Sequence, residues 1–255
     1  SFMVVFTCYD NFESMMTCIY DAWAARLGHS NIRLQTEPVG NLELFCEYRH
    51  IDTEMEKVQK VIRSIHKKIS FQAYQYVYAA SLSSHEEKLD RIYRFLVLGF
   101  ACGNAVLDML HQPEVQAIFE LQRSVYNETH KFREFVRFDR LENQILFSVI
   151  EPKSHVLTLL APHFEDRMPS EDWIITDKNR LLAVVHPKNQ EAFLTPITPQ
   201  ELAYMESVRN KKDSYTRLWK TFFDSVSIKE RANAKCQRNF LPLWYRKNMT
   251  EFTEE

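Results

Sequence analysis

Ionisable side chains crowd the stretch APHFEDR, in which His163, Asp166 and Arg167 lie within five positions of one another. His163 could act as a general base oriented by Asp166, while Arg167 could hold a phosphate group. Glu151 and His155, just upstream of the same predicted helix, could complete a polar pocket. The chemistry expected of such a site is hydrolase or glycosylase-like catalysis on a nucleic acid.

The same residues also have a structural explanation. His163 and Asp166 are ordinary polar positions on a helical turn after Pro162, and Arg167 near the helix end suits the helix dipole. No set of metal ligands, nucleophile elbow or paired-carboxylate motif singles this group out. The sequence therefore leaves open whether the chain is an enzyme, and it predicts neither a metal site nor a cofactor.

Positive charge is concentrated in the last fifth of the chain. The whole chain has a formal net charge of −2, yet residues 209–247 carry eleven Lys or Arg and three Asp or Glu. That segment is therefore +8, and the rest of the chain is −10. Arg231, Lys235 and Arg238 fall on one face of a predicted helix.

A surface of this composition is typical of nucleic-acid binding. Cations neutralise phosphates, amides can read base edges, and aromatic rings can stack on bases. DNA is therefore the predicted partner, although the basic face could instead meet the acidic remainder of the chain or an acidic protein. The residues predicted to contact nucleic acid are Arg167, Arg231, Asn233, Lys235, Gln237, Arg238, Trp244, Tyr245 and Arg246.

Several function classes are disfavoured by composition. The five cysteines are scattered without a C-x-x-C pair, which favours a reducing, cytoplasmic setting. Four glycines cannot form a G-x-G-x-x-G motif or a P-loop. The most apolar run, FLVLGFACGNAVLDML, contains Asn104 and Asp108 and is shorter than a membrane-spanning helix, so no membrane association is predicted.

The elements that must position these residues predict an α+β fold. The N-terminal region should form a βαββ unit, from the strand VVFTCYD, a helix over residues 12–27, and the strands IRLQTE and LELFCEYRHI. Asp10 and Glu13 have capping-box spacing before that helix. Alternation places Leu42, Leu44 and neighbouring apolar residues on one face of the third strand.

A central helical layer should follow from Thr53 to about Lys131, broken at Ser70, near Ser83 and at Pro113. A C-terminal ββαββ unit should then form. Its hairpins are FREFVRF with QILFSVIE and WIITD with RLLAVVH, separated by a short helix from Ser154.

Long helices should close this unit. Thr198, Pro199 and Glu201 mark the start of one of them, and an apolar stripe runs from Tyr215 to Val226. We expect two regions, 3–84 and 85–255, that share an interface.

Four stretches together resemble a bacterial "probable DNA metabolism protein" family over nearly the whole chain. They are CYDNFESMMTCIYDAW, FREFVRF, IEPKSHVLTLLAPHFEDRMPSEDWIITDKNR and LWKTFFDSVSIKERANAKCQRNFLPLWYRKNMTEF. The resemblance implies a C-terminal domain of unknown function that also occurs fused to uracil-DNA-glycosylase-like domains. It also implies a gene neighbour that encodes a radical-SAM iron–sulfur protein, and hence a role in DNA repair or modification.

Three functional hypotheses follow. The first is a DNA-binding accessory protein that works with the radical-SAM partner, and the second is an enzyme acting on nucleic acid through Glu151, His155, His163 and Asp166. The third is a protein-interaction scaffold. The chain lacks a cluster-binding cysteine triplet, so it is not itself expected to be the radical-SAM enzyme.

Overall fold

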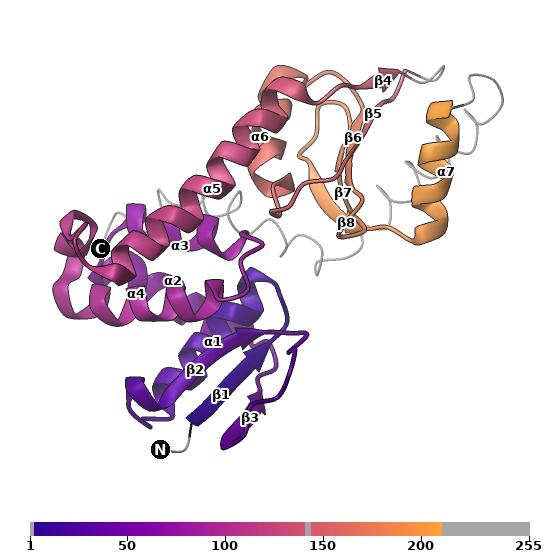
Figure 1. Ribbon diagram of the computed structural model, residues 1–255. Helices are drawn as coiled ribbons and strands as arrows, with labels where there is room; N and C mark the ends of the chain where they lie inside the picture. Colours follow the sequence, from indigo (N-terminus) through magenta and orange to yellow (C-terminus); the bar gives the residue numbers. More distant parts are fainter. Residues whose placement is uncertain (1–2, 141–143, 211–255) are drawn as a thin grey trace. The chain divides into compact units, whose positions relative to one another are not determined.

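The computed structural model describes residues 3–140 and 144–210, and the chain divides into two compact units, Ser1–Asn127 and Glu128–Glu255. The fold is α+β, as predicted, with a three-stranded sheet in the first unit and a five-stranded sheet in the second (Figure 1). In the described ranges no single helix is long and apolar enough to cross a membrane. The bent pair Lys88–Asp108 and Pro113–Phe135 reaches the required length and apolar composition only when the two segments are taken together.

The first unit begins with the predicted βαββ order. Both outer strands run parallel to β1 in the sheet order β2-β1-β3, and Cys8 lies opposite Thr36 while Thr7 lies opposite His50. The carboxyl ends of all three strands therefore meet at one edge of the sheet. The elements are β1 (Met3–Cys8), α1 (Phe12–Ala24), a 3-10 turn η1 (His29–Asn31), β2 (Ile32–Thr36) and β3 (Cys46–His50).

Two local predictions in this region are wrong. The side chain of Asn11, not Asp10, caps α1 by accepting a hydrogen bond from the Ser14 amide at 2.8 Å. Leu42 and Leu44 precede β3 and are exposed. In the register of the sheet, β3 begins at Cys46 opposite Met3, so Leu42 and Leu44 lie before the paired residues of this strand.

The central helices break where the sequence predicts. Ser70 caps α3 by accepting a hydrogen bond from the Ala73 amide, and Pro113 begins α5. The helix α4 protects the outer edge of β2, because Asp90 accepts from the Leu34 amide at 3.1 Å. The helices are α2 (Met55–Lys68), α3 (Phe71–Ser81), α4 (Lys88–Cys102) and α5 (Pro113–Phe135), with a 3-10 turn η2 (Gly103–Asp108) before α5.

The second unit contains the predicted ββαββ order and one further strand, β8. Its sheet order is β4-β5-β6-β7-β8, in which β5 and β6 are parallel and the other neighbours are antiparallel. The helix α6 connects the two parallel strands. The elements are β4 (Asp139–Arg140), β5 (Leu146–Ile150), α6 (Leu157–Arg167), β6 (Trp173–Asp177), β7 (Leu182–His186), β8 (Phe193–Pro196) and α7 (Pro199–Asn210).

The first predicted hairpin of this unit is only partly formed. Residues 132–135 belong to the last turn of α5, and β4 is only two residues long. The helix continues past Lys131 because Phe132 and Val136 pack against the apolar cluster beneath α6. The short helix predicted from Ser154 begins at Leu157 and runs through Pro162.

Apolar side chains alternate between the two faces of the larger sheet. Trp173 and Ile175 of β6 join the cluster that includes α6, whereas Ile174 joins the cluster that includes α7. The predicted capping box of α7 is confirmed, with the Glu201 amide donating to Thr198 Oγ1 at 3.1 Å and the Thr198 amide to the Glu201 carboxylate at 2.7 Å. The apolar stripe predicted from Tyr215 lies outside the described residues.

Candidate functional site

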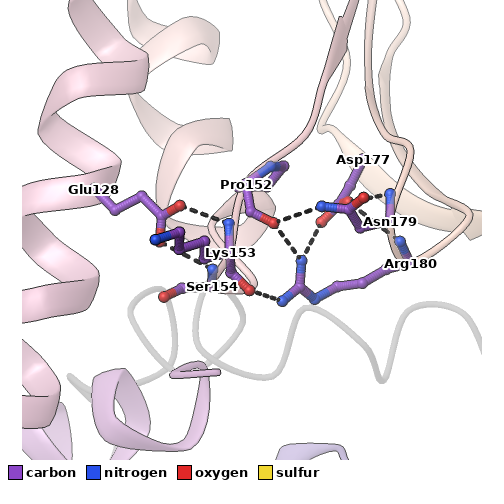
Figure 2. Close-up of polar contacts among 7 residues, drawn as sticks. All are labelled: Glu128, Pro152, Lys153, Ser154, Asp177, Asn179 and Arg180. Carbon is purple, nitrogen blue, oxygen red and sulfur yellow. Dashed lines mark hydrogen bonds and ion pairs between the residues drawn. The ribbon is translucent and has the colours of Figure 1, made fainter. Parts of the chain in front are cut away.

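The loop that follows β5 is held from the side of α5 by a carboxylate. Glu128 accepts the Lys153 amide at 2.6 Å with one oxygen and the Ser154 amide at 2.9 Å with the other (Figure 2). Two consecutive backbone donors of the loop that leads into α6 are thus satisfied by one side chain. Glu128 therefore fixes the entry to α6.

The opposite side of the same loop is held by a guanidinium group. Arg180 donates to the carbonyl oxygens of Pro152, at 3.2 Å, and Lys153, and Asn179 donates to Pro152 at 3.0 Å (Figure 2). We refer to Glu128, Asp177, Asn179 and Arg180 as the loop clamp. The segments EPKSH and ITDKNR, which both lie in one of the stretches that carry the family resemblance, meet in this clamp.

Asp177 orients the clamp from inside. Its side chain is fully buried, and its carboxylate accepts the amides of Asn179 and Arg180 and the Arg180 guanidinium at 2.9 Å. Burial raises the pKa of Asp177, and the charge of Arg180 opposes that rise. This aspartate has a structural role, as part of a satisfied turn and ion pair.

Glu151 and His155 lie at the two ends of the clamped loop. Glu151 is exposed and forms an ion pair with Lys178 at 3.2 Å, and Lys178 also pairs with Glu206 at 2.8 Å. His155 is half-buried, with its Nδ1 enclosed by the protein. Glu151 therefore points to solvent and His155 inward.

On α6, His163 and Asp166 lie one turn apart. Asp166 is exposed, and in the described ranges no hydrogen bond or ion pair joins it to His163. The Nε2 atom of His163 is buried without a hydrogen-bond partner among the described residues. Burial, then Arg133 and Arg167, lowers the pKa of His163. This shift favours the neutral imidazole, and Nε2 is closed to solvent.

Two arginines flank this histidine. Arg167 is exposed at the end of α6, and Arg133 on α5 is exposed and donates to the Leu159 carbonyl at 3.0 Å. In the part of the chain that is described, neither guanidinium forms an ion pair with a carboxylate. Arg133, His163 and Arg167 make up what we call the α6 arginine site. The other predicted nucleic-acid contacts, Arg231, Asn233, Lys235, Gln237, Arg238, Trp244, Tyr245 and Arg246, lie outside the described residues.

A polar cluster that the sequence analysis missed lies at the carboxyl edge of the first unit's sheet. His50 Nδ1 lies 2.6 Å from a Glu37 oxygen, and the Thr7 hydroxyl donates to the same oxygen at 2.8 Å. The other ring nitrogen of His50 lies 3.3 Å from Asp52, and Tyr9 meets the ring edge-on. The hydrogen bond to Glu37 raises the pKa of His50, and that to His50 lowers the pKa of Glu37.

This cluster had a signal in the sequence. Glu37 and His50 each stand at or next to the end of a predicted strand, and Thr7 lies within the predicted strand VVFTCYD. Parallel strands bring such ends together, and ligands of α/β sheets bind there. Their closeness depends on strand directions, which the sequence pattern alone does not fix. Within the described ranges no three His, Cys, Asp or Glu side chains form a metal-binding group.

Comparison with known families identifies the part of the chain that contains the clamp. A family model described as "Domain of unknown function (DUF4130)" matches residues 86–251. The chain belongs to the DUF4130 family. The match includes the loop clamp and the α6 arginine site, but the Glu37–His50 cluster lies before it. No curated protein matches the chain.

Proposed function

We propose that this DUF4130 protein is a DNA-binding accessory protein of bacterial DNA repair or modification, which works in the cytoplasm with a radical-SAM iron–sulfur partner. The observation that carries the proposal is the α6 arginine site. The charges of two exposed guanidinium groups help to lower the pKa of His163 there, and neither group has a carboxylate partner among the described residues. Guanidinium groups in this condition are suited to phosphate oxygens.

The sequence adds two supports. Residues 209–247 carry a net charge of +8, which suits a polyanionic ligand. The chain also resembles a family of DNA metabolism proteins whose genes neighbour that of a radical-SAM protein, and this resemblance is the basis for that partner. The loop clamp has a supporting role here, since it fixes the start of the helix that ends at Arg167.

Salt-titrated binding tests the proposal. We expect the wild-type chain to bind fluorescent DNA oligonucleotides, and the Arg133→Glu/Arg167→Glu variant to bind more weakly with a smaller salt dependence. Each lost phosphate contact should reduce the slope of log affinity against log salt by about 0.9 for duplex or about 0.7 for single strands. Lys131→Glu is the matched control for one reversal, because Lys131 is exposed on α5 two residues from Arg133 and so points to another side of that helix.

Two results would contradict the proposal. The first is a wild-type chain that binds neither duplex nor single-stranded DNA at low salt. The second is an equal loss of DNA affinity per reversed charge in the Lys131 control and in the arginine variant. That result would indicate diffuse electrostatic attraction rather than a binding site. Repeating the titration with the purified radical-SAM protein tests the partner, because a joint complex should bind DNA more tightly than either protein alone.

A second candidate function is an enzyme acting on nucleic acid, a hydrolase or glycosylase-like catalyst. The observation that favours it is the Glu37–His50 couple, in which a carboxylate held by Thr7 orients an imidazole at a sheet edge. Since Glu37 raises the pKa of His50, the ring would serve as a general acid. His50→Gln should then abolish product formation from DNA substrates while leaving DNA affinity unchanged. Unchanged turnover in that variant would exclude this role for His50.

A further inference from the structure

A groove in the first unit lies between α1, α2 and α4. Its volume is 330 Å3, which is within the usual range of small-ligand sites. Besides aliphatic side chains, it is lined by Tyr20, Trp23 and Phe100 and by Lys60, Ser64 and Lys68. We call it the aromatic groove. None of its lining residues belongs to the α6 arginine site or to the Glu37–His50 cluster.

The indole of Trp23 is partly open to solvent. It keeps 37% of its surface exposed, and its ring meets His29, Phe100 and Tyr93 in edge-type contacts at centroid distances of 4.8, 5.4 and 6.0 Å. Tyr20 and Phe100 are half-buried. An exposed indole beside two further rings presents flat apolar surface to a planar ligand, because every nucleobase has a face that stacks on such rings.

Cations and a hydroxyl lie along one side of the same groove. Lys60, Ser64 and Lys68 are spaced four residues apart on α2, so they follow one another along the helix at steps of about 6 Å. Lys60 Nζ lies 6.0 Å from the centre of the Tyr20 ring, and Lys68 Nζ lies 5.9 Å from that of Phe100. The positive charge therefore lies beside the rings.

Part of this charge has no carboxylate partner among the described residues. Lys60 pairs with Glu56, whose side chain is 78% exposed and free to turn toward solvent. Lys68 is exposed and has no carboxylate partner among the described residues. Lys57, on the same face of α2, is occupied by Asp21 and Glu54. Lys68 is thus the lysine at the groove best placed to receive an external anion.

We propose that the aromatic groove binds an unpaired nucleotide of single-stranded DNA, with its base against Trp23 and its phosphate at Lys68 and Ser64. This inference rests on the proposed function and deepens it, because it names the strand type and a base-binding position. A nucleotide has a planar base that can stack on the aromatic rings and an attached phosphate that can bind the lysines of α2. A duplex cannot bind in this way, because its bases are stacked on each other and cannot reach Trp23.

The test combines affinity with location. The full-length chain is titrated with oligothymidylate, with a duplex of equal length and with thymidine 5′-monophosphate. Trp23→Ala should lower the affinity for oligothymidylate at least about fivefold, which is the smallest loss expected from one stacked base. Trp23→Phe keeps a ring and should recover most of the affinity. Oligothymidylate carrying a photoreactive base should crosslink to the peptide that contains Trp23.

Lys68→Glu provides a second variant that leaves the apolar packing intact. It should reduce the single-strand salt slope by about 0.7 or more. Lys67→Glu is its matched control, with the same charge change at the adjacent exposed residue of α2, which does not line the groove. The control should lose clearly less affinity than Lys68→Glu.

The outcomes separate the groove from the proposed function. Suppose that wild type binds DNA and that the Arg133→Glu/Arg167→Glu variant does not. If Trp23→Ala and Lys68→Glu then lose no more affinity than Lys67→Glu, the groove proposal is overturned and DNA binding stands. If no DNA binds wild type, both are overturned. Thymidine monophosphate binding as tightly as oligothymidylate would assign the groove to a free nucleotide and overturn the strand proposal.

Discussion

Removing the Glu128 carboxylate should loosen the start of α6. Its two oxygens accept the amides of Lys153 and Ser154 at 2.6 and 2.9 Å. Hydrogen bonds to a charged acceptor contribute about 1.5–3 kcal/mol each when well shielded. Because Glu128 is only half-buried and Lys153 is exposed, we take about 1 kcal/mol for each bond. Glu128→Ala should therefore destabilise this region by about 2 kcal/mol, and Glu128→Gln, which keeps one acceptor, by about half as much.

Amide hydrogen exchange measures this effect at the two donors themselves. A loss of about 2 kcal/mol corresponds to about thirtyfold faster exchange of the Lys153 and Ser154 amides. The melting temperature of the second unit should fall by about 8 °C. Glu134→Ala is the control on the same helix, because Glu134 is exposed and pairs only with exposed His130, at 3.3 Å, among the described residues. It should change stability by less than about 0.5 kcal/mol.

A specific result would refute this reasoning. If Glu128→Ala left both amides within about twofold of wild-type exchange, the carboxylate would not hold the loop, and Asn179 and Arg180 would have to do so. If Glu128→Ala and Glu134→Ala accelerated exchange equally, the effect would come from α5 as a helix and not from the clamp.

Three further outcomes are expected. Gly99→Ala should destabilise the first unit by about 1 kcal/mol in denaturant titrations, because its new Cβ would lie 2.7 Å from Ile69 Cδ1. Adding Ile69→Val, which deletes that methyl group, should recover part of the lost stability. Glu37→Gln should lower the pKa of His50 measured by NMR. Since folding raises that pKa, the contribution of His50 to stability is present below its unfolded pKa of about 6.5 and is lost as pH rises through the folded value. Thr198→Ala should cost about 1 kcal/mol of stability and speed amide exchange in the first turn of α7.

Much of the fold could be predicted because it depends on local signals. The breaks at Ser70 and Pro113 and the capping box at Thr198 are properties of a few adjacent residues, and the structure confirms each of them. The cap of α1 was misassigned because Asp10 and Asn11 are both good caps. Asp10 instead pairs at 2.6 Å with Lys88, which lies far away in the sequence.

The polar clusters were harder to predict because their members are distant in the sequence. Glu128, Lys153 and Arg180 come from α5, a loop and a turn, and they meet only in the folded structure. The Glu37–His50 couple likewise requires knowing that two strands flank β1 in parallel. Local density of ionisable residues drew attention to His163 and Asp166, whereas the hydrogen-bonded groups lie elsewhere.

The range of the family match bears on how the two candidate functions relate. Residues 86–251 include the loop clamp, α6 and the basic segment 209–247, so these features lie in the part of the chain that the family model matches. The Glu37–His50 couple and all lining residues of the aromatic groove except Phe100 lie before that range. If the proposals hold, phosphate binding belongs to the shared part, and base binding or acid catalysis depends on the N-terminal residues. A DUF4130 domain joined to a different N-terminal region should therefore keep salt-dependent DNA binding and lose the preference for single strands. Equal single-strand preference in such a protein would assign base recognition to the shared part and remove the aromatic groove from consideration.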